Sequence, residues 1–353
     1  MIQMQDINSQ NIKTFNNLLS DALRIAIVTH MKPDGDALGS SLAMQGFIRT
    51  CGKQSTIVLP HRYPSNLEFL TEGNTLSSII IYEETPSEAE KAIYEADLII
   101  CLDFNAFHRT DKLEQALNSS KAAKVLIDHH LNPDRCRFDV SFSETQVSSA
   151  SELLFHILMN MPQIEGDAHK LPQVSINALM TGMTTDTNNF ANSVFPSTLQ
   201  MASALLDAGA DRDYILLNLH NMFSESRLRL LGHMLKDLMV ITEDGVAYMV
   251  LDSSTLKEYN ITEGDTEGFV NMPLSIKKVR MSIMLKEDGD KARVSIRSKK
   301  GTSANRCAGL YFNGGGHENA AGGRLMIPQD IARIGLAGKY IEEHTHRFFE
   351  EEK

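Results

Sequence analysis

Acidic and histidine side chains follow three hydrophobic segments of the chain at the point where each segment ends. They are His30, Asp34 and Asp36 after the segment 25–29, Asp103 after the segment 97–102, and Asp128, His129 and His130 after a segment that ends at residue 127. In an open parallel sheet, the carboxyl ends of the strands share one edge, where ligands bind. We therefore expect these side chains to converge, and Asp186, at the end of a helical segment, to join them.

A cluster of this kind carries the charge to hold divalent cations. Two carboxylates about 4 Å apart repel by roughly 4 kcal/mol at an effective dielectric constant of 20. Four at one site are strongly unfavourable unless some are protonated or cations bind. The four are Asp34, Asp36, Asp103 and Asp186, whose charge two divalent cations would balance. With neutral His30 and His129 they form an oxygen and nitrogen donor set, which favours Mn²⁺ over Mg²⁺. Zn²⁺ is a weaker alternative without thiolate ligands.

The ordinary alternative is that each Asp caps a helix and that each His packs in the core. For any one of these residues taken alone, this alternative is the stronger. It is weak for the whole set, because the residues end three hydrophobic strands. The pattern therefore favours a site that does chemistry.

The elements that position these side chains follow from hydrophobic periodicity. Continuous apolar runs predict buried strands, and apolar residues at helical spacing predict helices. Predicted strands cover 25–29, 54–59, 78–82, 97–102 and 124–127, and predicted helices cover 11–24, 37–50, 87–95, 152–161, 173–185, 198–208 and 225–238. Such strands, separated by helices, indicate a parallel sheet covered on both faces.

The pattern changes after residue 245. Apolar residues alternate with others in 246–250, 281–285 and 294–296. This alternation predicts half-exposed strands of an antiparallel or mixed sheet. The last 25 residues predict a closing helix. We expect an α/β protein with a catalytic domain over 1–222, a helical linker over 223–239 and a smaller α/β domain over 240–353.

The composition limits the classes of protein. With 353 residues, 42% hydrophobic and 22% charged, the chain has the size of about two globular domains. Its apolar runs are far shorter than the roughly 18 residues of a membrane span. Its first residues lack the apolar core of a signal peptide, so we expect a cytoplasmic protein. Four isolated cysteines indicate neither a zinc knuckle nor a disulfide framework.

The charge is negative overall but uneven. The chain carries 34 basic and 45 acidic side chains, a net charge of −11, which argues against nonspecific coating of duplex DNA. Residues 277–306 nevertheless hold ten Lys or Arg and three acidic residues, a local charge of +7. A basic segment within an acidic protein indicates a local anionic ligand. A solvated pair of strands is the alternative.

Five motifs resemble those of the DHH phosphoesterase superfamily. Four of them are His30-x-x-x-Asp34-x-Asp36 with a following Ala-x-Gly-Ser, Asp103 after an apolar strand, Asp128-His129-His130, and Asp186 within Gly-x-x-Thr-Asp-Thr. The fifth resembles the DHH-associated domain of the first type and comprises Arg297-Ser298, Asn305 and the loop Gly314-Gly315-Gly316-His317. The motifs occur in the right order over nearly the whole chain. Asp-His-His alone would be weak evidence, but the five together are highly specific.

The resemblance implies a two-metal phosphoesterase in which Asp103 bridges both cations. One site is then completed by His30 and Asp34, and the other by Asp36, His129 and Asp186. The implied catalytic residues are Asp103, His130 and Asp128. His130 is expected to stabilise the transferring phosphoryl group or to protonate the leaving oxygen. Asp128 is expected to orient a histidine.

The resemblance also assigns substrate binding to the second domain, with the active site in the cleft between the domains. The expected contacts are Arg109 from the first domain and Arg297, Ser298, Asn305, Gly314, Gly315, Gly316 and His317 from the second. Adjacent glycines allow close approach of a phosphate to backbone amides. A flexible turn is the alternative for the glycines, and a surface position for Arg109. Phe104, Phe190 and Phe312 are candidates to stack a base, with a core or wall position as the alternative.

Within the superfamily, the chain looks like the stand-alone nanoRNase and pAp-phosphatase group, which is sometimes called exopolyphosphatase-related. The implied reaction is hydrolysis of short oligoribonucleotides such as pApA to mononucleotides, of pAp to AMP, or of both. An exopolyphosphatase and a non-catalytic nucleotide sensor are the alternatives. The resemblance further implies a possible homodimer, while the short apolar runs and the negative charge predict neither a membrane nor a duplex DNA partner.

Two positions depart from the family pattern. Phe104-Asn105 follows Asp103, where a small residue is more usual, and Asn188-Asn189 occupies a position often held by Gly. Neither departure removes a predicted ligand. Both are expected to reshape the substrate cleft.

Overall fold

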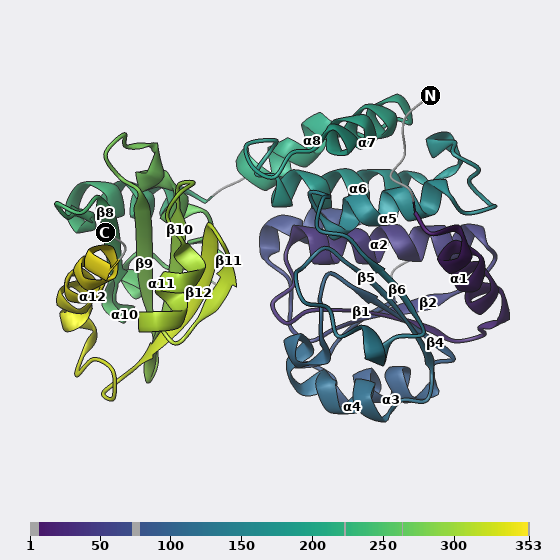
Figure 1. Ribbon diagram of the computed structural model, residues 1–353, viewed down its shortest axis with the longest axis horizontal. Helices are drawn as coiled ribbons and strands as arrows, with labels where there is room; N and C mark the ends of the chain where they lie inside the picture. Colours follow the sequence, from purple (N-terminus) through teal and green to yellow (C-terminus); the bar gives the residue numbers. More distant parts are fainter. Residues whose placement is uncertain (1–6, 73–77, 222–223, 263, 352–353) are drawn as a thin grey trace. The chain divides into compact units, whose positions relative to one another are not determined.

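The chain divides into two compact units, Met1–Met222 and Phe223–Lys353. The computed structural model describes residues 7–72, 78–221, 224–262 and 264–351. Each unit contains a β-sheet flanked by helices (Figure 1). Within these described ranges, no helix combines the length and the apolar composition that crossing a membrane requires.

The first unit is built on a six-stranded parallel sheet. Its strands are β1 (Ile25–Thr29), β2 (Ser55–Leu59), β3 (Ser78–Ile81), β4 (Leu98–Leu102), β5 (Ala123–Asp128) and β6 (Val140–Ser143). They lie in the order β3-β2-β1-β4-β5-β6, and every neighbouring pair is parallel. The predicted parallel sheet is confirmed. The sixth strand was not predicted, because only Val140 and Phe142 of its four residues are buried.

Helices cover both faces of this sheet (Figure 1). They are α1 (Ser9–Asp21), α2 (Gly35–Thr50), α3 (Pro86–Glu95), α4 (Glu114–Ser119), α5 (Ala150–Met159), α6 (Gln173–Asp186), α7 (Pro196–Asp207) and α8 (Arg212–Leu216). On one face, α2, α5 and α6 bury Phe47, Leu154 and Met180 in one cluster. On the other face, α3 and α4 bury Ile93 and Leu117. Burial from both sides explains the uninterrupted apolar sequence of the strands.

Helices α2 and α6 pack closely because glycines line their contact. A Cβ atom at Gly39 would lie 2.5 Å from the carbonyl oxygen of Ala178 in α6, which is closer than real Cβ atoms come to backbone. A Cβ at Gly46 would lie 2.9 Å from Val174 Cγ1. This close approach holds the first turn of α2 beside the last turn of α6. Both turns carry predicted ligands.

The second unit is built on a six-stranded mixed sheet. Its strands are β7 (Val240–Ile241), β8 (Val246–Leu251), β9 (Met281–Asp288), β10 (Lys291–Ser298), β11 (Gly315–His317) and β12 (Ala320–Met326), in the order β11-β12-β10-β9-β8-β7. All neighbouring pairs are antiparallel except β8 and β9, which are parallel. Of the two predicted alternatives, an antiparallel and a mixed sheet, the mixed sheet is confirmed, because the long connection 252–280 lets the chain return in the same direction.

Four α-helices pack around this second sheet in the described part of the unit. They are α9 (Glu225–His233), α10 (Ser253–Glu258), α11 (Ala304–Tyr311) and α12 (Ala337–Glu351). The closing helix predicted at the C-terminus is thus present as α12. Within the stretch predicted as a linker, Leu230 and Met234 are buried against Met249 and Phe269 of the second unit. The functional roles assigned to the two domains stay predictions.

Candidate active site

Three predicted site residues lie at the carboxyl ends of neighbouring central strands. His30 follows β1, Asp103 follows β4, and Asp128 is the last residue of β5. In the sheet order, the chain moves from β1 to β2 and β3 on one side and then to β4, β5 and β6 on the other. The point between β1 and β4 is therefore the switch point of the sheet, where ligands bind in folds of this kind.

The first group of possible ligands comprises His30, Asp34 and Asp103. Their ligand atoms all lie within 4.8 Å of one another. His30 Nε2 lies 3.3 Å from Asp103 Oδ2 and 3.8 Å from Asp34 Oδ1. The other ring nitrogen, Nδ1, lies 2.8 Å from the carbonyl oxygen of Met31. A proton on Nδ1 satisfies that contact and leaves Nε2 as the free donor to a cation.

The second group comprises Asp36, His129 and Asp186, whose ligand atoms also lie within 4.8 Å of one another. His129 Nε2 lies 3.4 Å from Asp186 Oδ2 and 3.4 Å from Asp103 Oδ1. The two oxygens of Asp103 thus face different groups, Oδ2 toward His30 and Oδ1 toward His129. The six predicted ligands are brought together in the arrangement that the motifs imply, while their assignment as metal ligands stays a prediction.

Local backbone geometry positions Asp103 and Asp34 in this cluster. Asp103 has a φ of +62°, a left-handed conformation that is uncommon for residues other than glycine. Asp34 caps α2, since its Oδ1 accepts hydrogen bonds of 3.1 Å from the amides of Asp36 and Ala37. The ordinary capping role and the predicted ligand role therefore coexist at Asp34.

Asp36 is held by the N-terminus of α5. Its carboxylate accepts hydrogen bonds from the amides of Ala150, at 2.6 Å, and Ser151, at 2.9 Å. The partial positive charge at the N-terminus of α5 further stabilises the Asp36 carboxylate. Gly182 of α6 makes room for the carboxylate, because a Cβ there would lie 2.8 Å from Asp36 Oδ1 and would overlap Ser151 Oγ. The sequence did not identify α5 as part of the site, and it gave Gly182 only as the glycine of the motif around Asp186.

The ionisable groups of the cluster perturb one another. Burial opposes the charge of His30, but its hydrogen bond to Asp103 and the nearby carboxylates raise the pKa of His30 to about 9. The same balance raises the pKa of His129 to about 10. Burial, and then the charge of Asp103, raise the pKa of Asp36 to about 7. Burial, and then the charge of Asp36, raise the pKa of Asp186 well above its ordinary value. The cluster therefore has an excess of negative charge in a buried place.

The donor set fits divalent cations. Oδ1 of Asp103 is buried and makes no hydrogen bond within the described residues, although His129 and His130 nitrogens lie 3.4 and 3.7 Å from it. A buried carboxylate oxygen is costly unless it is paired or coordinates a metal. Four carboxylates and two imidazoles are donors that suit Mn²⁺ and Mg²⁺. The donor atoms therefore suit the two divalent cations whose charge would balance the four carboxylates.

His130 and Asp128 form a tight pair beside this cluster. Asp128 is fully buried, and its Oδ1 lies 2.7 Å from His130 Nδ1 while its Oδ2 accepts the His130 amide at 3.1 Å. Asp128 therefore orients the ring of His130. The same ring nitrogen lies 3.7 Å from Asp103 Oδ1. The catalytic roles of both residues stay predictions.

The predicted substrate contacts of the second unit gather at the end of β11 and β10. Arg297 and His317 both pair with Ala320 of β12, so they flank the same residue. Asn305 Oδ1 accepts a hydrogen bond of 2.8 Å from the Gly316 amide. Gly314 needs to be glycine, because a Cβ there would overlap the carbonyl oxygen of Gly322. These residues form a locally ordered loop rather than a flexible turn.

Arg297 and Ser298 differ in what they offer to a ligand. The guanidinium of Arg297 donates to the carbonyl oxygen of Ile296 at 3.0 Å, and burial lowers the pKa of Arg297. Its hydrogen bond to a neutral carbonyl leaves its charge uncompensated. Ser298 is buried, and its hydroxyl donates to the carbonyl oxygen of Thr302 at 2.6 Å. Ser298 therefore braces the loop, and a contact with substrate stays a prediction.

The loop after β1 is braced by the backbone of Arg109, a predicted phosphate contact, and by His61, which the sequence analysis did not identify. The amide of Met31 donates to the carbonyl oxygen of Arg109 at 2.7 Å. The amide of Lys32 donates to His61 Nδ1 at 3.1 Å, and His61 Nε2 lies 3.4 Å from Asp111 Oδ2. His61 follows the end of β2 at the same edge of the sheet. This place after a predicted strand was the one sequence feature that could have marked His61 as part of the site.

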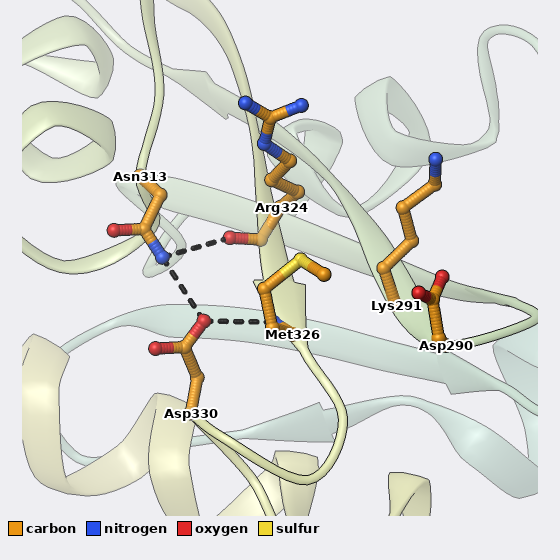
Figure 2. Close-up of a pocket in the computed structure, with 6 residues that line it drawn as sticks. All are labelled: Asp290, Lys291, Asn313, Arg324, Met326 and Asp330. Atoms are coloured by element: carbon orange, nitrogen blue, oxygen red, sulfur yellow. Dashed lines mark hydrogen bonds between the residues drawn. The ribbon is translucent and has the colours of Figure 1, made fainter.

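A pocket of about 590 Å³ lies in the second unit beside the end of β12 (Figure 2). It is lined by Asp290, Lys291, Asn313, Arg324, Met326 and Asp330. Asp330 Oδ2 accepts hydrogen bonds from the amide of Met326, at 2.7 Å, and from Asn313 Nδ2, at 3.1 Å. Figure 2 shows the side chains of Arg324 and Lys291 turned away from Asp330. The lining residues are not among the predicted site residues, and acidic and basic groups are mixed.

Comparisons with known proteins match both units of the chain. Residues 24–183 match the DHH family, N-terminal domain, and residues 243–334 match the DHHA1 domain. A bifunctional oligoribonuclease and PAP phosphatase NrnA from Thermus thermophilus is 30% identical over 85% of this chain and 84% of its own. The protein of that name from Bacillus subtilis is 27% identical over 88% and 92%. The solved structure of an exopolyphosphatase-related protein from Bacteroides fragilis is 35% identical, with a TM-score of 0.90 over 98% of both chains.

Proposed function

We propose a substrate and a reaction from the premise that this chain belongs to the DHH family, whose N-terminal domain and DHHA1 domain together match most of its length. The chain is accordingly a metal-dependent phosphoesterase. Its proposed reaction is the hydrolysis of short oligoribonucleotides such as pApA to mononucleotides, and of pAp to AMP. The observation that carries the proposal is Asp103, whose two oxygens face His30 on one side and His129 on the other.

The proposed cations are two Mn²⁺ ions, with Mg²⁺ as the substitute. His30 and Asp34 would hold one cation, and Asp36, His129 and Asp186 the other, with Asp103 between them. When bound, such a pair of cations activates water near neutral pH and neutralises the charge of the phosphoryl group. Mn²⁺ is favoured over Mg²⁺ because imidazole nitrogen belongs to the donor set.

The chain's own groups have two further roles in this proposal. The hydrogen bond between Asp128 and His130 Nδ1 holds a proton on that nitrogen, so Nε2 is the atom available to the leaving oxygen. In the second unit, the guanidinium of Arg297 and the ring of His317 supply charge-assisted contacts to substrate phosphates. Arg109 is proposed as a phosphate contact from the first unit. Placement of the substrate between the two units, a homodimer and a cytoplasmic location stay predictions.

The substrate is supported by the named relatives. The proteins from Thermus thermophilus and Bacillus subtilis bear the name bifunctional oligoribonuclease and PAP phosphatase and align with most of this chain. The local basic segment 277–306 adds a preference for an anionic ligand. A small anionic substrate satisfies both observations.

Product analysis tests the proposal. The protein is incubated with pApA with and without Mn²⁺, and the products are separated by ion-exchange chromatography, with pAp and polyphosphate in parallel. We expect AMP from pApA only when Mn²⁺ is present, and AMP from pAp as a second activity. The Asp103→Asn variant is the matched control for a contaminating nuclease. Absence of AMP from pApA in the presence of Mn²⁺ would contradict the proposal.

An exopolyphosphatase is the second candidate. The Bacteroides fragilis structure bears the name exopolyphosphatase-related protein and aligns with 98% of this chain. Phosphate release from polyphosphate alone would move the assignment to this inorganic substrate. Binding of nucleotides without turnover at saturating Mn²⁺ would instead indicate a sensor. The complete set of six predicted ligands argues against a sensor, because a silent site has no need to retain them.

A further inference from the structure

Three phenylalanines were candidates to stack a base, and the structure separates them. Phe104 and Phe312 are fully buried in the cores of the first and the second unit, respectively. Phe190 is only half-buried, with one part packed against the core of the first unit. A nucleobase can therefore reach Phe190 and not the other two. Phe190 also follows Asp186, a predicted ligand, by only four residues.

The backbone at Phe190 is unusual. Asn188, Asn189 and Phe190 have φ values of +46°, +56° and +66°. Asn tolerates this left-handed region, which explains why Asn can stand where Gly is frequent in the family. A bulky residue such as Phe rarely adopts it. Backbone strain of this kind concentrates at functional sites, where the surrounding structure holds it in place.

Several contacts hold the left-handed turn. The amide of Asn189 donates to the carbonyl oxygen of Thr184 at 2.8 Å, and the amide of Phe190 donates to Thr187 Oγ1 at 3.0 Å. Arg212 Nη2 donates to Asn189 Oδ1 at 2.8 Å. The turn is therefore anchored both to the end of α6 and to α8. These bonds fix the backbone from which the Phe190 side chain projects.

Arg212 extends the ring into a composite surface. Its guanidinium carbon lies 5.9 Å from the centroid of the Phe190 ring, within the range of a cation–π contact. Its hydrogen bond goes to a neutral amide, which does not compensate its charge. Aromatic rings and guanidinium planes are the two surfaces on which proteins stack unpaired bases. Phe190 is four residues from Asp186, and four residues of extended chain span at most about 14 Å. This surface therefore lies close to the cluster of predicted metal ligands.

We propose that Phe190 and Arg212 form a stacking platform for a nucleobase of the substrate. The base belongs to the nucleoside attached to the phosphate that reaches the cation cluster. The inference rests on the proposed function, because only a nucleotide substrate has a base to stack. With such a platform, binding depends on a nucleobase. A nucleotide substrate is then distinguished from polyphosphate, which has no base.

The kinetic test compares substrates with and without bases. The Phe190→Leu variant keeps an apolar side chain of similar size and removes the aromatic face. We expect its KM for pApA to rise at least about fivefold, the lower end for loss of one stacked base. Its kinetics with a base-free analogue, in which hydrogen replaces each base, are expected to stay as in the wild type. Tyr94→Leu is the control, since Tyr94 is 50% exposed on α3, on the opposite face of the sheet.

A binding test gives a readout that does not require turnover. A pAp analogue that carries 2-aminopurine loses fluorescence when its base stacks, and Ca²⁺ is used in place of Mn²⁺. We expect quenching with the wild type and Tyr94→Leu and weaker quenching with Phe190→Leu. Equal quenching in all three proteins, or equal loss of activity with pApA and its base-free analogue, would overturn the platform. Lack of pApA hydrolysis by the wild type would overturn the proposed function, and lack of any quenching would then overturn the platform as well.

Discussion

Replacement of Gly182 by Ala tests whether α6 must approach Asp36 as closely as it does. A Cβ at this position would lie 2.8 Å from Asp36 Oδ1 and would overlap Ser151 Oγ. Asp36 is fixed by the α5 amides, and rotation of the Ser151 hydroxyl would not relieve the crowding, because Ser151 Cβ, fixed by the α5 backbone, would lie 2.9 Å away. The methyl group can therefore be accommodated only if the carboxylate of Asp36 or α6 moves.

The size of the effect follows from this geometry. Overpacking of a buried contact costs about 1–3 kcal/mol of the free energy of unfolding. Disturbing groups that hold a metal ligand lowers metal affinity by roughly 10–100-fold. We expect Gly182→Ala to lower the Mn²⁺ affinity of the proposed site at Asp36, His129 and Asp186 by this factor. The cation held by His30 and Asp34 is expected to keep most of its affinity.

The assay is a titration with Mn²⁺ followed by electron paramagnetic resonance, which counts free ions and resolves two affinities. Gly46→Ala is the matched control, because its Cβ would lie 2.9 Å from Val174 Cγ1 and would overlap Ser175 Oγ. This substitution crowds the same contact between α2 and α6, but Gly46 lies ten residues from Asp36, about 15 Å along α2. Gly46→Ala is expected to lose stability and keep both Mn²⁺ affinities. Two wild-type affinities in folded Gly182→Ala, or equal losses in both variants, would show that the close approach of α6 to Asp36 does not set the Mn²⁺ affinity.

Three further predictions concern catalysis, substrate and stability. Asp103→Asn should abolish hydrolysis of pApA while circular dichroism shows an intact fold, and near-normal activity would rule out the bridging role. Arg297→Ala should raise KM more than it lowers kcat; the reverse pattern in steady-state kinetics would place Arg297 in the transition state. Burial opposes the charge of Glu152, but His156, whose Nε2 lies 3.6 Å from Glu152 Oε1, and hydrogen bonds from Ser148 and Thr198 hold its pKa at about 2, below the ordinary 4.5. The charged form therefore stabilises the fold above about pH 4.5 by about 3 kcal/mol, and this is lost as pH falls toward 2. Urea unfolding at pH 7 and pH 3 should show a smaller change in Glu152→Gln than in the wild type, and an equal change would contradict this account.

The parallel sheet and the convergence of its strand ends could be predicted because both depend on local sequence. Each central strand is buried on both faces, so its residues form an uninterrupted apolar run. The first polar residue after such a run must lie at the carboxyl edge. His30 and Asp103 were located by this rule alone, before any distance was known.

The direction of β8 relative to β9 could not be predicted in the same way. Alternation of apolar residues reports which face of a strand is buried, and it is the same for parallel and antiparallel neighbours. The connection between the two strands decides their direction. Its length was visible in the sequence, but alternation alone left both an antiparallel and a mixed sheet open.

The groups that hold the ligands were also hidden. The Asp36 carboxylate is bound by amides of Ala150 and Ser151, more than a hundred residues away along the chain. Backbone amides leave no signature in the residue types, so no motif marks them. Gly182 does belong to the motif around Asp186, but its role could not be read there because it depends on atoms of other helices. The three candidate phenylalanines were equivalent in the sequence, and only burial singled out Phe190.

The most direct test of the central claim is an anomalous difference map from crystals grown with Mn²⁺ and measured at the manganese edge. The account predicts two peaks roughly 3.5–4 Å apart, as in two-metal sites. One peak should lie among His30, Asp34 and Asp103, and the other among Asp36, His129 and Asp186, with Asp103 contacting both. A single peak, or two peaks that do not share Asp103, would contradict the account.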